Sequence, residues 1–518
     1  MRSLAAISIL IAVVACSSVR PPAVVPGVSV QQRLADADRL IGAGCYDCLL
    51  QAYREHDGLR AAATTPELRL RATVGAIRAA ALVAMREREL GMADTGHVSI
   101  ARELVEPVTD AFPTLKQTLE VVALLPGMIG TNRSAATDEA LERAMALRRN
   151  IDAYTAMLRD AAPRDELSAY AWATLMCTVG ENRNRTLAEI FDPVGSLAET
   201  PLLAFRRASC HGHDASKLES VLQQDSRWVE ANYLLGLAAI GRRPRPDMDA
   251  AEAFYRRAYD WHPRWPSLTQ ALANVAVAAE EFEDAVRFYD ETLSMEPRFG
   301  EARLGRVRAL TYLARHEDAI EETARLLELR WNPGEALYWR ALNETKLRRL
   351  DAAWTDIEDA AKLVINAAVP KLAGFIAYQR QQLAVSRAKF EESRERNPND
   401  CETGYYLGMV LAEQREWSPT AEALSATALC VDTAEKGLLA EIEAIRESGD
   451  QPARQARQIA RRERDIANGR RLRATSWFNT AVACYHLSRQ SDARQYAEKV
   501  IDDDEFGERA KEILSRLK

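Results

Sequence analysis

The sequence lacks any hydrophobic run long enough to cross a lipid bilayer. An apolar segment extends from Leu4 to Ala15, but a membrane-spanning helix needs about 20 apolar residues. No later segment is apolar enough to cross a membrane either. The formal net charge of −7 over 518 residues is small, which argues against a general affinity for nucleic acid. These absences weigh against a membrane-spanning protein and against a nucleic-acid-binding protein.

Familiar catalytic patterns are also missing. We find no nucleophile with an adjacent base, no phosphate-binding loop and no regularly spaced set of metal ligands. The sequence therefore predicts no enzyme activity, no cofactor and no metal.

Alternation of apolar and polar residues with period two never persists for long after about Gln31, whereas helical periodicity recurs throughout. A chain of 518 residues also exceeds the ~250–300 residues at which single cores stop growing. The sequence therefore predicts an all-α protein, built either from several domains or as one elongated array.

The first residues have the layout of an export signal. Met1 and Arg2 supply positive charge, the apolar segment follows, and Val13-Val14-Ala15-Cys16 ends it. These last four residues resemble the lipobox of bacterial lipoproteins, which implies cleavage before Cys16 and lipidation of its sulfur. Ser17 stands where that family carries aspartate for inner-membrane retention, so the resemblance implies an outer-membrane anchor facing the periplasm. An ordinary secretory signal is the alternative.

This interpretation makes residues 1–15 a lipoprotein signal peptide and residues 16–30 a Pro-rich tether. A helix cannot persist through the tether, because it contains Pro21, Pro22, Pro26 and Gly27.

A repeat of nearly constant length runs through the middle of the chain. Small residues recur with spacings of 34, 34, 33 and 34, at Ala273, Val307, Ala341, Gly374 and Gly408. Twelve residues after each lies a second small residue, at Ala285, Ala319, Ala353, Ser386 and Thr420. Antiparallel helices packed at about 8–10 Å need small side chains where they cross. A single helix pair cannot bury its apolar face alone, so the spacing predicts stacked helix pairs.

The repeat resembles the tetratricopeptide family, whose consensus matches NYLLGLAAIGRR with AAEAFYRRAYDWHP, and also CETGYYLGMVLAEQREW. The match covers roughly 229–432 and 474–507. The resemblance implies tetratricopeptide-type helical hairpins stacked into a right-handed superhelical solenoid. We expect divergent helical repeats over 31–225, tetratricopeptide repeats over 226–432, and C-terminal helices with a final repeat and an amphipathic cap over 433–518.

In this family the first helix of each pair lines a concave groove. The resemblance therefore implies partner-binding residues at Tyr233, Asn274, Arg308, Tyr312, Tyr338, Tyr378, Tyr405, Phe478 and Tyr485. Tyrosine offers a rigid contact surface with a polar tip, which suits peptides or glycan rings. The alternative is that these rings pack between adjacent repeats. Only Asn274 fits the clamp with which some family members hold a C-terminal carboxylate, so we do not expect that ligand.

The chain has eight cysteines. Without the lipidated Cys16 an odd number remains, so at least one should be free or paired between chains. Cys401 and Cys430 fall at the same end of one helix pair and form a candidate disulfide. Cys45 and Cys48 form a Cys-x-x-Cys motif at a helix start, which can serve thiol–disulfide exchange. Because its flanks are helical, a structural disulfide or buried thiols are the favoured interpretation.

Two polar segments remain. Cys210, His211, His213 and Asp214 offer metal-ligand types in one loop, but Asp214 or Ser216 serving as a helix N-cap is favoured. The stretch Arg454–Arg473 places Arg454, Arg457, Arg461 and Arg464 on one helical face, and Asn468-Gly469 predicts the end of that helix. The arginines could bind an anionic partner, although a solvated face is the more usual role of such a stripe.

The sequence thus predicts a lipid-anchored cell-envelope scaffold that binds protein or peptide partners on the concave face of a solenoid. The alternatives are a glycan- or nutrient-binding surface lipoprotein and a thiol–disulfide oxidoreductase using Cys45 and Cys48. The partner, the membrane leaflet it faces and the oligomeric state do not follow from the sequence.

Overall fold

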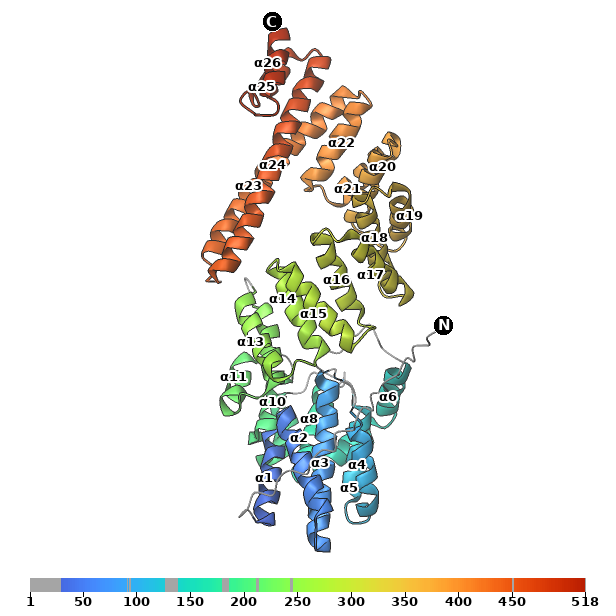
Figure 1. The fold of residues 1–518 in the computed structure, drawn as a ribbon, viewed down its shortest axis with the longest axis vertical. Coiled ribbons are helices and arrows are strands. Elements are labelled where there is room, and N and C mark those ends of the chain that lie inside the picture. Colours follow the sequence, from blue (N-terminus) through green and yellow to red (C-terminus); the bar gives the residue numbers. More distant parts are fainter. Residues whose placement is uncertain are drawn as a thin grey trace, which may run out of the picture.

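The computed structural model describes residues 29–90, 92, 95–125, 138–178, 186–210, 214–242, 246–449 and 451–517. Within these ranges every regular element is helical, as predicted (Figure 1). Cys16, His211 and His213 lie outside the described residues. In the described part, no helix combines the length and the apolar character that crossing a bilayer requires.

The first part of the chain is a helical bundle built around α3. This helix, Pro66–Leu90, is buried along almost all of its length after Ala72. It contacts α2, α4 and α8, and α1 contacts α10. These contacts between elements distant in sequence make residues 30–224 a bundle rather than a linear stack of pairs.

The bundle helices are α1 Val30–Ala43, α2 Tyr46–Ala61, α3 Pro66–Leu90, α4 His97–Val105, α5 Pro113–Leu124, α6 Asp138–Arg149, α7 Ile151–Ala161, α8 Glu166–Thr178, α9 Leu187–Phe191, α10 Pro201–Ser209 and α11 Ala215–Gln224, with short 3₁₀ helices at Glu106–Val108 and Asp192–Glu199.

A solenoid of helix pairs follows. Its helices are α12 Val229–Ile240, α13 Met248–Trp261, α14 Pro266–Ala278, α15 Phe282–Met295, α16 Gly300–Tyr312, α17 His316–Glu328, α18 Pro333–Lys346, α19 Leu350–Ala361, α20 Ala368–Gln379, α21 Leu383–Arg396 and α22 Cys401–Glu413. Each helix contacts the next along the chain, and they follow one another along an arc (Figure 1).

The predicted register of the repeat is confirmed. Ala273, Ala341, Ala285 and Ala353 are all 0% exposed. A Cβ on Gly408 would collide with Leu424, which shows that the two helices of this pair approach too closely for a larger residue.

The turns inside the repeats show the same period. In six pairs, from α14–α15 onward, the second helix follows a residue in the left-handed region, at Glu280, Ala314, Arg348, Gln381, Arg415 and Ser488. Five of these six come seven residues after the small residues that define the repeat, and none is glycine. The chain therefore accepts backbone strain here to reverse its direction.

A long helical hairpin, α23 Trp417–Arg446 and α24 Pro452–His486, interrupts this regular pattern. The predicted helix end at Asn468-Gly469 is wrong, because α24 continues through it. Gly469 lies beside Val431 of α23, so the glycine allows close packing instead of ending the helix. Helix α23 also runs without a break through residue 432, where we expected the repeat region to end.

Two short helices, α25 Gln490–Glu498 and α26 Gly507–Arg516, complete the chain. Phe506, just before α26, stacks on Phe478 with ring centroids 5.0 Å apart. The last helix thus covers the end of the solenoid, as its amphipathic sequence predicts.

Candidate functional site

The first helices of the pairs form the inner face of the arc. Helix α14 contacts α16, α16 contacts α18, α18 contacts α20 and α20 contacts α22, whereas the second helices contact one another less. In a curved stack the inner elements lie closer together, so these helices line the concave face. Four of the predicted partner-binding tyrosines lie on α16, α18, α20 and α22.

Tyr312, at the end of α16, is the most exposed of these tyrosines, at 56%. Its ring stacks on Phe282 with centroids 4.8 Å apart and an interplanar angle of 16°. Stacking fixes the orientation of the ring while one face stays open. Such a pre-ordered aromatic surface loses little conformational entropy when a ligand binds.

A cluster of rings lies farther along the face, around Tyr406. This ring contacts Phe375 at 5.2 Å, Tyr405 at 5.3 Å and Tyr378 at 6.3 Å between centroids. The Tyr378 hydroxyl donates to Glu413, and burial together with that carboxylate raises the pKa of Tyr378. Tyr405 and Tyr378 were predicted, whereas Tyr406 was missed because its repeat position was not among those considered. Its adjacent tyrosine was the available signal.

Arg308 and Tyr338 lie between these two aromatic regions. The Arg308 guanidinium pairs with Glu335 and lies 5.8 Å from the centre of the Trp339 ring. Tyr338 is half-buried and meets Trp339 edge-on at 5.7 Å. Both predicted residues therefore lie on the face and are already engaged with neighbouring side chains.

A glutamate recurs at the second position of four repeats and is contacted by a preceding helix each time. Glu301 accepts a hydrogen bond from Gln270 at 3.3 Å, and Glu402 pairs with Lys371 at 2.5 Å. Glu335 pairs with Arg308. Glu230, in the first repeat, lies 3.6 Å from Arg86 of the bundle. The first three contacts link adjacent repeats, and the fourth links the first repeat to the bundle. Aligning the second positions would have revealed the recurring glutamates from the sequence.

The partner-binding prediction is wrong for Tyr233 and Phe478. Tyr233 is 6% exposed and packs on Trp265 at 4.6 Å between ring centroids. Phe478 is 3% exposed beneath α26. For both rings the packing alternative holds, since neither offers a surface to a partner.

Asn274 and Tyr485 are both exposed. Asn274 Oδ1 accepts a hydrogen bond of 2.6 Å from the Tyr289 hydroxyl, and Tyr485 meets His486 edge-on at 5.9 Å. Asn274 is therefore held by its own repeat, and Tyr485 lies on α24, apart from the ring cluster.

Known proteins match this chain through its repeats. A model of the tetratricopeptide repeat family matches residues 271–332. Residues 271–332 therefore contain tetratricopeptide repeats. A solenoid of such repeats suggests a scaffold for protein–protein interaction. No curated protein matches the sequence.

Solved structures match the chain loosely and at low sequence identity. YrrB, a tetratricopeptide protein described with an unusual peptide-binding site, is 18% identical; the match covers 34% of this chain and 91% of YrrB, with a TM-score of 0.30. PilF of Pseudomonas aeruginosa is 16% identical over 56% of this chain and 97% of its own, with a TM-score of 0.28. The Cut9–Hcn1 structure is 13% identical over 94% and 96%, with a TM-score of 0.39. Superpositions this loose carry no argument.

Disulfides brace both the bundle and the tetratricopeptide repeats. The structure joins Cys401 to Cys430, and it also joins Cys177 to Cys210 and Cys45 to Cys48. Cys484 is free and buried among the described residues. Cys210 is thus committed to a disulfide, and Asp214 caps α11 through the amide of Lys217. Neither residue supports the metal alternative for that loop.

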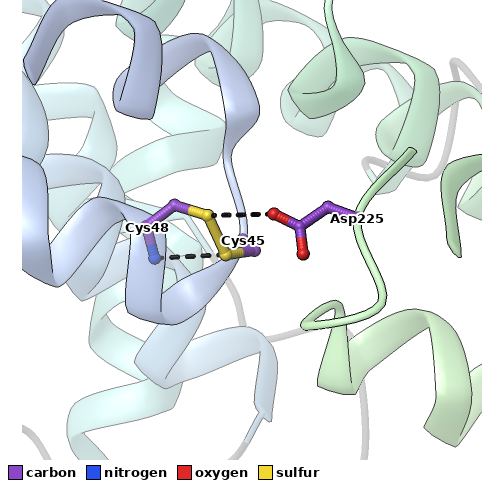
Figure 2. A group of neighbouring side chains, drawn as sticks. All are labelled: Cys45, Cys48 and Asp225. Carbon is purple, nitrogen blue, oxygen red and sulfur yellow. Dashed lines mark hydrogen bonds between the residues drawn. A yellow bond between two sulfur atoms is a disulfide. The ribbon is translucent and has the colours of Figure 1, made fainter. Parts of the chain in front are cut away.

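Cys45, Cys48 and Asp225 are the only described residues of ligand type whose donor atoms converge (Figure 2). The two sulfurs are bonded to each other, and Asp225 Oδ2 lies 3.7 Å from Cys48 Sγ. Asp225 is also held by Arg227, whose hydrogen bonds keep the pKa of the carboxyl below its usual value. Both cysteines are 0% exposed, so an incoming thiolate cannot reach the disulfide without local opening.

The bundle also contains a network of buried charges next to the first tetratricopeptide repeat. Arg86, which is 0% exposed, donates to Glu89 and to the Tyr170 hydroxyl, each at 2.7 Å. Its guanidinium lies 4.8 Å from the centre of the Trp228 ring. Glu230 is 0% exposed, and burial raises its pKa to about 7 even though the charge of Arg86 opposes the shift. This network anchors the solenoid to the bundle and leaves no open site.

Proposed function

We propose that the chain is a lipid-anchored scaffold of the cell envelope, which binds an extended segment of a partner protein on the concave face from α16 to α22. One observation carries the proposal: Tyr312 is 56% exposed and held in place by Phe282, and partly exposed tyrosines follow it on the next three first helices. Oriented aromatic rings on successive repeats suit a ligand that runs along the face.

The envelope location rests on separate support. Val13-Val14-Ala15-Cys16 resembles a lipobox, and three disulfides are typical of a chain that matures in an oxidising compartment. The proposed anchor is a lipid on Cys16, and the proposed location is the outer membrane on its periplasmic side.

A surface lipoprotein that binds glycans or nutrients is the second candidate, because exposed tyrosine rings also stack on sugars. A thiol–disulfide oxidoreductase is less well supported, since both sulfurs of the Cys45–Cys48 pair are fully buried.

Affinity capture from detergent-solubilised envelope tests the scaffold. The wild-type chain should retain a partner in a fixed ratio, and a Tyr312→Ala, Tyr378→Ala double variant should lose most of it. Trp261→Ala removes another exposed aromatic residue, at 51% exposure on the second helix α13, and should retain the partner. Retention on polysaccharides without any protein partner would favour the glycan candidate instead.

The anchor has its own test. A Cys16→Ser variant should appear in the soluble periplasmic fraction and should not incorporate labelled palmitate. Palmitate incorporated by this variant as well as by the wild type would exclude lipidation at Cys16.

A further inference from the structure

The hairpin of α23 and α24 extends far beyond the repeat to which it belongs. We call residues 433–473 the hairpin arm. Its two helices run antiparallel (Figure 1) and bury Ile442, Ile445 and Ile466 between them. Arg462 pairs with Glu441 at 3.2 Å, and Arg470 pairs with Glu435 at 2.5 Å. The arm is therefore a self-supporting element.

The tip of the arm returns to the start of the solenoid. Arg454 pairs with Asp249 and Glu252 of α13, which lie about two hundred residues earlier in the chain. In Figure 1 the tip reaches down to α13 and the end of α14. The helices α14 to α22 follow an arc, and the arm connects the two ends of this arc directly, from the last repeat to the first ones.

A second group of arginines binds the turn between α14 and α15. Arg457 donates to the Ala279 carbonyl at 3.3 Å and pairs with Glu281. Arg461 lies 3.0 Å and Arg464 3.6 Å from carboxylate oxygens of Glu280. The arginine stripe, which the sequence suggested for an anionic partner, therefore pairs with carboxylates of the same chain.

This contact consists almost entirely of charged groups. Arg454 is 3% exposed and is the only buried residue of the arm between 451 and 464. The apolar residues of this stretch, such as Ala456 and Ile459, are exposed or half-buried. The other end of α24, in contrast, buries Phe478 and Ala481 in an apolar cluster. One end of the helix is fixed by hydrophobic packing and the other is held by ion pairs.

We propose that the arm tip and the acidic edge formed by Asp249, Glu252, Glu280 and Glu281 make a reversible ionic clasp that closes the solenoid. Each repeat contacts only its neighbours, so small rotations at successive interfaces add up and separate the two ends. The ion pairs of Arg457, Arg461 and Arg464 are partly exposed and weaken with salt, because the Debye length falls from about 10 Å at 0.1 M to about 3 Å at 1 M. The buried pairs of Arg454 are screened less. Charge screening therefore opens the clasp.

Opening exposes the concave face from the side of the arm. The gating of partner access rests on the proposed function, whereas the clasp itself does not. A partner that enters from this side would bind the open form more tightly and shift the population toward it.

Energy transfer between two labels measures the clasp directly in the full chain. Asp260 at the end of α13 and Glu447 at the arm tip are exposed and make no ion pair with another described residue. Dyes attached to cysteines introduced at these positions report the distance between the arm and the solenoid. We expect high transfer efficiency in about 0.05 M NaCl and the loss of roughly half of it in about 1 M NaCl.

Charge reversal identifies the groups responsible. The triple variant Arg454→Glu, Arg457→Glu, Arg461→Glu should show low efficiency at both salt concentrations. Arg471→Glu is the matched control: Arg471 lies on the same helix, is 76% exposed and pairs with Glu505 instead, so this variant should behave like the wild type. Adding Asp249→Arg, Glu252→Arg and Glu281→Arg to the double variant Arg454→Glu, Arg457→Glu, which leaves the Arg461–Glu280 pair intact, should restore high efficiency at low salt.

The proposal is overturned if the labelled wild type keeps the same efficiency at both salt concentrations. This measurement needs only the wild-type fold, so it decides the matter even if the triple variant does not fold. It is also overturned if efficiency depends on protein concentration, because the arm would then clasp a second copy. If the distance depends on salt but no partner is captured, the clasp is supported and the proposed scaffold function is wrong. If a partner is captured but the distance stays constant, the scaffold function is supported and the clasp is wrong.

Discussion

The N-terminal bundle and the tetratricopeptide solenoid are both helical, but they bury different kinds of side chain. The bundle buries Arg86, Glu89 and Arg206 against Glu230 of the first repeat, and each of the four is at most 1% exposed. The solenoid buries alanines and glycines at its helix crossings, and most of its ion pairs are partly exposed. Periodic small residues can build any number of pairs, whereas a buried charge network works only for one arrangement of specific helices.

The largest expected effect removes the central cation of the bundle. Arg86→Met should lower the free energy of unfolding by about 3–5 kcal/mol, because it leaves buried carboxylates without their partner. Urea denaturation followed by tryptophan fluorescence measures this loss. Arg349→Met is the solenoid counterpart: Arg349 pairs with Glu317 at the surface, and its loss should change stability by at most about 1 kcal/mol. Equal effects at the two sites would remove the distinction between the regions.

The pH dependence of stability should separate the junction of bundle and first repeat from the rest of the solenoid. The pKa of Glu230 is raised by burial to about 7, so the folded state keeps a proton that the unfolded state releases near the ordinary glutamate pKa of 4.5. Stability is therefore greatest below the unfolded pKa and falls as pH rises through the window from 4.5 to about 7. The fall amounts to about 3 kcal/mol, at 1.36 kcal/mol per pKa unit.

Glu230→Gln should flatten this fall in denaturation curves recorded across that range. Glu301→Gln changes the exposed glutamate at the same repeat position and should leave the fall of stability with pH unchanged. Farther along the solenoid, burial also raises the pKa of Glu344 to about 7, so Glu344→Gln should remove a separate part of the slope. A slope that survives both the Glu230 and the Glu344 substitution would come from other groups.

Tight helix crossings predict a smaller effect within the solenoid. Ala353→Leu, or the equivalent Ala285→Leu, should cost about 1–3 kcal/mol, because both alanines are 0% exposed where two helices meet. The neighbouring Ala352 is exposed, and Ala352→Leu should change stability by no more than about 0.5 kcal/mol. Thermal unfolding followed by circular dichroism compares the variants. Unchanged melting of both buried-site variants would mean that the crossings are not tight.

The smallest expected effect concerns the turns that are particular to the solenoid. Ala314 adopts a positive φ of 56° and is exposed. Ala314→Gly should raise the free energy of unfolding by roughly 0.5–1 kcal/mol, because glycine adopts this conformation without steric strain. Precise urea midpoints measure the gain. A loss of stability instead would show that the added flexibility of the unfolded chain outweighs the relief of strain.

Parts of the candidate site could be read from the sequence and parts could not. The period of the repeat placed Tyr312, Tyr338, Tyr378 and Tyr405 on the first helices, where the structure has them. It could not show that Tyr233 is covered by Trp265, because the burial of a ring depends on its spatial neighbours. The bundle escaped prediction for a similar reason: contacts such as α1 with α10 join segments that share no period.

Local patterns by themselves determined the helices, their pairing and the register of the repeats, because helix crossings require small residues at fixed intervals along the chain. Only the tertiary structure decided which distant charges meet. The arginine stripe on α24 is visible in the sequence, but its carboxylates on α13 and the α14–α15 turn come within reach only after the intervening repeats have curved the chain back on itself. The curvature of a solenoid is the sum of many small rotations, and no single stretch of residues specifies that sum.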